Sequence, residues 1–213
     1  MTRLFRSEIQ CVLCGTTSMH TVIMSTHAIG LPDLDLRPPE AHRSTMECWA
    51  QRCPQCGYCA PLLDRELPGA REALSTEAYR RQLTEADRPE LANTFACLAL
   101  IHAAGGNRSQ AGQAMLYAAW VCDDDACSAG SRACREAAIE YLRGQPELSE
   151  PDLTMLLDLL RRLGRFAEAR RLLQRVPRER CHEITQAILS FQERLIEQAD
   201  QDRHNLKEAE KAE

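Results

Sequence analysis

Two Cys-x-x-Cys-Gly segments limit the folding of this chain more than any other feature. They are Cys11-Val-Leu-Cys14-Gly15 and Cys53-Pro-Gln-Cys56-Gly57. The two-residue gap lets both sulfurs of one knuckle face a single ion, and the glycine permits the turn that aims backbone N–H groups at the thiolates. We therefore predict one structural Zn2+ per chain, with no position left open for a substrate water. Its ligands would be Cys11, Cys14, Cys53 and Cys56.

The spacing of the two knuckles leaves alternatives to this assignment. The 38 residues between Cys14 and Cys53 exceed the usual spacing of a zinc ribbon, although a long insertion costs little loop entropy. A thiol-redox pair is the main alternative, but such a pair lies at the start of a helix in a βαβ unit, and neither knuckle is followed by that pattern. Zinc is the better interpretation.

Other potential ligands lie near the knuckles. Cys59 extends the series Cys53, Cys56 and could replace Cys56 as a ligand or shield the site, and Cys48 is also close in sequence. We favour the simpler interpretation of both as small buried thiols. Three histidines could offer nitrogen ligands, but four thiolates already complete a tetrahedron. These histidines are His20, His27 and His42.

The remaining cysteines fall among alanine and leucine residues, where cysteine usually packs as a small apolar side chain. We expect them in the helical core: Cys97, Cys122, Cys127, Cys134 and Cys181. Eleven cysteines would indicate disulfides in a secreted chain. The first residues show no apolar run of signal-peptide length, and no stretch approaches the roughly 18 apolar residues of a membrane helix. We therefore expect a cytoplasmic protein without a membrane segment.

The composition changes near Pro68-Gly69, which predicts two domains and a tail. Residues 1–68 carry short β-type runs, such as His20–Met24 and Thr45–Trp49, and would form a small β-type zinc-binding module with paired knuckles. Residues 69–202 are rich in alanine and leucine and would form an all-α domain. Residues 203–213 are charged and predict a disordered tail.

Capping residues divide the second domain into expected helices. Their ranges are about 75–87, 89–105, 109–120, 125–144, 149–164, 166–176 and 182–202. Ser149-Glu-Pro-Asp152 is typical of a capping box. The last range carries Ile184, Ile188, Phe191 and Leu195 at helical spacing.

Two helix pairs share a local pattern that resembles the tetratricopeptide repeat, whose helix pairs stack into a curved array. Gly164-x-Phe166-x-x-Ala169-x-x-x-Leu173 places small residues where helices must approach closely, and Gly106-x-Arg108-x-x-Ala111-x-x-x-Met115 repeats the small and apolar positions. The two glycines are 58 positions apart, whereas one repeat spans about 34 residues. The domain is therefore predicted to be repeat-like, without regular stacking.

Several motifs together resemble an uncharacterised bacterial family that is known only as a domain of unknown function. They are the two knuckles with Tyr58, the Tyr117-Ala-Ala-Trp120 segment and Leu156-Leu-Asp-Leu-Leu-Arg-Arg-Leu-Gly164. The resemblance spans Cys11 to about Val176. It implies a cytosolic bacterial protein with a paired-knuckle module followed by repeat-like helices, and it supplies no activity.

A closed metal site, repeat-like helices and the lack of a catalytic motif favour a non-enzymatic adaptor that binds a protein partner on its helical surface. The alternative is a nucleic-acid-binding regulatory protein, because residues 161–180 hold eight arginines against Glu168 and Glu179. Against it, the net charge is −5, and arginines at helical spacing are typical of a solvated face. A redox or metal sensor is a third hypothesis, which requires accessible cysteines of low pKa. The sequence identifies neither the partner nor the oligomeric state.

Overall fold

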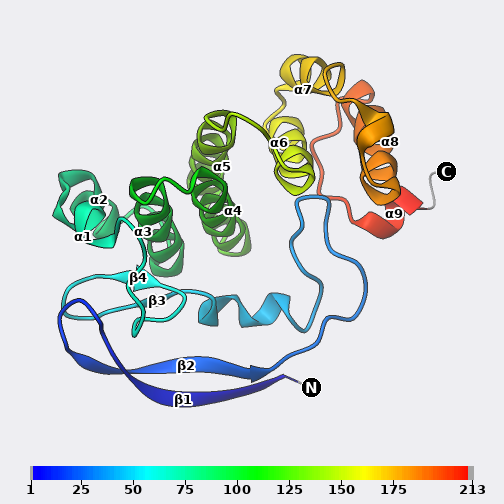
Figure 1. Cartoon of the computed structure of the whole chain (residues 1–213). Helices are drawn as coiled ribbons and strands as arrows, with labels where there is room; N and C mark the ends of the chain where they lie inside the picture. Colours follow the sequence, from blue (N-terminus) through cyan, green and yellow to red (C-terminus); the bar gives the residue numbers. More distant parts are fainter. Residues whose placement is uncertain (1, 211–213) are drawn as a thin grey trace. The chain divides into compact units, whose positions relative to one another are not determined.

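The computed structural model describes residues 2–210, which divide into two compact units (Figure 1). The first unit combines the segment through His27 with Ser44–Gly144, and the second combines Ala28–Arg43 with the segment from Gln145 onward. A small β-type region is thus followed by a mostly helical body, as predicted. The division differs from the predicted boundary at residue 68, since the knuckles belong to the same unit as five of the helices that follow them.

The first unit begins with an antiparallel hairpin of β1 (Arg3–Gln10) and β2 (Thr17–Ser25). Its register pairs Gln10 with Thr17 and Phe5 with Val22. Side chains of a strand alternate between two faces, so Phe5, Ser7 and Ile9 share one face of β1. The first knuckle forms the turn of this hairpin.

A second, very short sheet pairs β3 (Gln51–Arg52) with β4 (Cys59–Ala60) around the second knuckle. The strand expected at Thr45–Trp49 is wrong, because Arg43–Cys48 forms a 3-10 helix, η1. Thr45, Met46 and Cys48 are buried while Glu47 is exposed, which is the pattern of a turn of helix and not of an alternating strand. The Trp49 indole N–H donates to Thr45 Oγ1 at 2.9 Å and closes this turn.

Five helices complete the first unit: α1 (Ala70–Ser75), α2 (Glu77–Leu83), α3 (Glu90–Ala104), α4 (Arg108–Asp124) and α5 (Ser128–Arg143). The helix expected at 75–87 is α2, which begins after Ser75 and ends earlier, at Leu83, and the preceding α1 was not predicted. Thr76 is extended, separates the two helices and caps α2 by accepting the Tyr79 N–H. Helix α4 packs against both α3 and α5. A Cβ at Gly112 would lie 2.9 Å from Leu142 Cγ, so only glycine permits this approach of α4 to α5.

The second unit contains α6 (Glu150–Arg162), α7 (Phe166–Leu173), the 3-10 helix η2 (Arg178–Arg180), α8 (Glu183–Glu197) and α9 (Leu206–Glu210). The capping box at the start of α6 is confirmed, since Ser149 Oγ accepts the Asp152 N–H at 3.2 Å. Helix α8 packs on α6 and α7.

The segment after Arg203 is ordered through Glu210, which differs from the predicted disordered tail. Asn205 forms a β-bridge with Asp33, and the Leu34 N–H donates to the His204 carbonyl oxygen at 2.9 Å. Leu34, Phe191 and Ala209 form an apolar cluster. These long-range contacts order the tail; residues 211–213 lie outside the described part of the chain.

Across residues 2–210, none of the helices combines the length and the apolar character needed to cross a membrane. The tetratricopeptide-like arrangement of the helices stays a prediction.

Candidate metal centre

The two knuckles have the same backbone hydrogen bonds. In the first, Cys11 N–H donates to the Thr16 carbonyl and Gly15 N–H donates to the Cys11 carbonyl, at 2.9 and 2.8 Å. In the second, Cys53 N–H donates to the Tyr58 carbonyl and Gly57 N–H to the Cys53 carbonyl, at 2.8 and 3.0 Å. Both glycines have left-handed backbones, with φ of 75° and 74°. This conformation favours glycine and explains why each motif ends on that residue.

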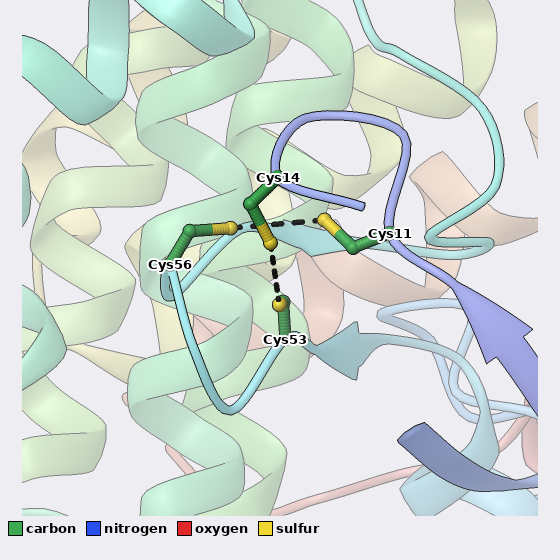
Figure 2. Close-up of side chains that lie close together, drawn as sticks. All are labelled: Cys11, Cys14, Cys53 and Cys56. Carbon is green, nitrogen blue, oxygen red and sulfur yellow. Dashed lines mark hydrogen bonds between the residues drawn. The ribbon is translucent and has the colours of Figure 1, made fainter. Parts of the chain in front are cut away.

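Four sulfurs meet between the knuckles, as Figure 2 shows. All four lie within 4.8 Å of one another. Two separations are 3.7 Å, between Cys11 and Cys56, and 3.6 Å, between Cys14 and Cys53. Metal–sulfur bonds of about 2.3 Å in a regular tetrahedron place the sulfurs about 3.8 Å apart. The four cysteines predicted from the sequence are therefore brought together with the spacing of a tetrahedral thiolate site.

Backbone and side-chain contacts hold the knuckles in this position. The Val12 N–H in the first knuckle donates to the Leu63 carbonyl at 2.9 Å, which links it to the chain beyond the second knuckle. Tyr58 is fully buried, and its hydroxyl donates to the Arg65 carbonyl and accepts the Leu67 N–H. These bonds fix the segment that follows the second knuckle.

Helix α2 supports the second knuckle directly, a contact that the sequence analysis missed. The Tyr79 hydroxyl donates to the Gly57 carbonyl at 2.9 Å, and Tyr79 is 1% exposed. A Cβ at Gly57 would lie 2.4 Å from Leu83 Cδ2. The Leu83 side chain of α2 can therefore pack against this position because glycine has no side chain. This packing explains why the knuckles and the helices form one unit. Tyr79 and Leu83, four positions apart on a largely polar helix, were the signal for it.

The thiols of the cluster differ in their surroundings. Hydrogen bonds from the side chain and backbone of Thr16 lower the pKa of the exposed Cys14 thiol to about 6. Burial raises the pKa of Cys11 and, more strongly, of Cys56. A bound cation would favour the thiolate at every position, because a metal ion stabilises the negative sulfur.

The other ligand candidates lie outside the cluster. Cys59 is fully buried, and its sulfur donates to the Gly57 carbonyl at 3.3 Å. A side-chain hydrogen bond with Cys59, together with burial, raises the pKa of Cys97 in α3. Cys48 is buried in η1 and His20 Nε2 pairs with Ser18 Oγ at 2.8 Å. Among the described residues, the four predicted cysteines make the one cluster with metal-binding geometry, and His27 and His42 are not part of it.

The prediction of core positions for the other five cysteines is partly wrong. Cys97, Cys122 and Cys134 are fully buried in α3, α4 and α5, as expected. Cys127 and Cys181 are half-buried, because each lies just before the start of a helix or in a connection where the chain meets solvent.

The arginine-rich segment 161–180 is largely engaged in the fold. Arg161 is completely buried: Nε donates to Gln192, Nη2 to Asp158, and Nη1 to the Asp202 carbonyl. The expectation that this guanidinium faces solvent or phosphate is wrong. Arg165 forms a two-point ion pair with Glu168 one turn further along α7.

The donor set fits zinc. Four sulfur ligands select soft or borderline cations, and a tetrahedral S4 set is typical of structural zinc. An ion held there would cross-link the hairpin to the second knuckle and would supply folding energy. No family model, curated protein or solved structure matches this chain. The fold and site thus define a mostly helical protein with a four-cysteine cluster, and its function is inferred from these residues alone.

Proposed function

We propose that the protein is a non-enzymatic, zinc-binding adaptor with one structural Zn2+ on Cys11, Cys14, Cys53 and Cys56. The observation that carries this proposal is the set of four sulfurs within 4.8 Å of one another. Four protein ligands leave no coordination position for a substrate, so the ion would stabilise structure and would not activate water.

The helical surface would supply the interaction. A hollow of about 380 Å3 lies between α7 and α8. Its apolar residues are Leu173 and Ile196, and its rim carries charges of both signs, including Arg170 and Glu193. We propose that this hollow receives a segment of a protein partner, whose apolar side chain would enter between the two helices. Phe191 of α8 does not belong to this hollow, because it lies in the buried apolar cluster with Leu34.

A site-specific crosslinking experiment tests the adaptor role. A photoreactive residue at Gln174, on the rim of the hollow, should capture a discrete partner in the native cell, whereas one at the exposed Arg132 of α5 should not. Capture at Gln174 should be lost when Glu197, an exposed residue on the rim of the same hollow, is replaced by Arg. Equal capture at both positions, or capture unaffected by Glu197→Arg, would contradict the proposed surface.

A gel-shift assay with the purified protein tests nucleic-acid binding, the competing hypothesis. Since Arg161 is buried and Arg165 is paired, only exposed arginines such as Arg171 and Arg175 could reach phosphates. Contacts of this kind weaken steeply as salt is added. We expect no sequence-selective shift in a gel assay at physiological salt. A selective complex tighter than about 1 μM, lost in an Arg171→Ala, Arg175→Ala variant, would favour nucleic acid over the adaptor role.

A further inference from the structure

The β1–β2 hairpin leaves its outer backbone edges open. Its sheet contains these two strands, and within residues 2–210 no further backbone hydrogen bond joins either strand to another element. A two-stranded sheet is marginally stable in water and gains from additional strands. Figure 1 shows β1 and β2 as a twisted two-stranded ribbon, so each strand has one edge without a partner strand. The free edge of β1 can therefore accept another strand.

We propose that β1 pairs antiparallel with β1 of a second copy of this chain, about a two-fold axis at Ser7. The pairing would make a continuous four-stranded sheet from two hairpins. The inference goes beyond the adaptor role and does not depend on it, since it concerns neither the metal nor the helical surface.

The backbone of β1 presents the groups that this pairing needs. The Cys11 N–H points toward the other arm of the hairpin, where it donates to the Thr16 carbonyl. Along an antiparallel strand, N–H and C=O groups of successive residues point to opposite edges. The groups at alternate positions thus face the free edge. These positions are Leu4, Arg6, Glu8 and Gln10.

Charge selects one register among the symmetric ones. With the axis at Ser7, Arg6 of each copy lies directly opposite Glu8 of the other, which gives two attractive pairs. Moving the axis to Arg6 or to Glu8 would place like charges face to face, which destabilises a sheet. The side chains of Arg6 and Glu8 are both exposed, and neither forms an ion pair within the described part of the chain.

The apolar residues of β1 agree with the same register. Phe5 is 45% exposed and would lie opposite Ile9 of the second copy, at a position where cross-strand side chains approach most closely. Leu4 is 43% exposed, and Gln10 of the second copy would cover part of it. The register that pairs the charges therefore also shields the exposed apolar side chains.

Charge reversal tests the proposal through sedimentation of the full chain over a concentration series. The wild-type protein should form a dimer. Arg6→Glu and Glu8→Arg should each weaken dimerisation by about tenfold or more, because each turns both attractive pairs into repulsive ones. Within one hairpin these residues face only the neutral Thr21 and Met19, so each variant should retain the wild-type circular dichroism.

Mixing the two single variants provides the decisive control. Arg6→Glu carries two acidic residues and Glu8→Arg two basic residues, so an equimolar mixture should form heterodimers as tight as the wild type. A misfolded variant could not recover in this way. A wild-type protein that stays monomeric throughout, single variants that dimerise like the wild type, or a mixture that stays monomeric would each overturn the proposal.

Discussion

The Tyr79 hydroxyl donates a hydrogen bond to the carbonyl oxygen of Gly57 at 2.9 Å, which ties helix α2 to the second knuckle. Residues 22 positions apart are thereby joined at the rim of the metal cluster. Within the described part of the chain, the Gly57 carbonyl also accepts a hydrogen bond from the Cys59 sulfur at 3.3 Å. The oxygen–oxygen bond from Tyr79 is the shorter and stronger of the two.

We expect Tyr79→Phe to lower the free energy of unfolding by about 1–2 kcal/mol, the usual cost of losing one buried hydrogen bond. Chemical denaturation with zinc present would measure it. Tyr141→Phe is the matched control, since the Tyr141 hydroxyl has no hydrogen bond within the described residues, and its effect should stay within about 0.5 kcal/mol. Equal midpoints for Tyr79→Phe and the wild type would show that the contact contributes nothing.

The buried guanidinium of Arg161 holds the second unit together, so its removal should be costly. Arg161→Met would leave the Asp158 carboxylate buried with the neutral Gln192 amide as a donor and without its cation, and loss of one member of a buried charge pair costs about 3–5 kcal/mol. Arg171→Met, on the exposed face of α7, should cost less than about 0.5 kcal/mol. Thermal unfolding of both variants tests this expectation; similar losses of stability would contradict the assigned network.

Acid should weaken the local contact between Glu208 of α9 and His204, which lies just before that helix. A hydrogen bond with His204 lowers the pKa of Glu208 below its ordinary value of 4.5. A carboxyl with a lowered pKa stabilises the fold above its ordinary pKa, and this contribution is lost as the pH falls through the folded value. Stability should therefore decline below about pH 4.5.

Carboxyl NMR titration measures this effect directly. Glu208 should titrate below 4.5 in the wild type, and His204→Gln should move its pKa back toward 4.5. A wild-type Glu208 that titrates at its ordinary value would show that the His204 contact is absent in solution.

Chelation should disorder the knuckles, the hairpin and α2, because α2 rests on the second knuckle. Helices α4 and α8 have apolar contacts of their own and should stay protected. Hydrogen exchange with and without chelator resolves the segments separately. Loss of protection in every helix would mean that the metal holds the whole protein together, and no loss anywhere would mean that the cluster is not structural.

The sequence was sufficient for features that depend on local spacing. Cys11, Cys14, Cys53 and Cys56 could be grouped because the two-residue gap and the glycine after it fix each knuckle within five residues. The start of α6 was predicted for the same reason, since Ser149 caps it from inside the motif.

Features that depend on distant partners could not be predicted. Asp33 pairs with Asn205 and Leu34 packs on Phe191, which orders a tail that its own composition would leave disordered. In the sequence, Arg161 has the pattern of a surface residue. In the fold, its guanidinium donates to Gln192 and to the Asp202 carbonyl oxygen. Periodicity reports which face of a helix is buried and does not identify what covers it.

Metal content of the purified protein tests the central claim most directly. Elemental analysis should give one zinc per chain for the wild type and for Cys181→Ser, whose thiol lies outside the cluster. The Cys11→Ser, Cys14→Ser double variant removes half of the ligands and should lose the ion. Full zinc occupancy in that double variant, or a wild-type protein purified without zinc that fails to take it up, would contradict the four-thiolate site.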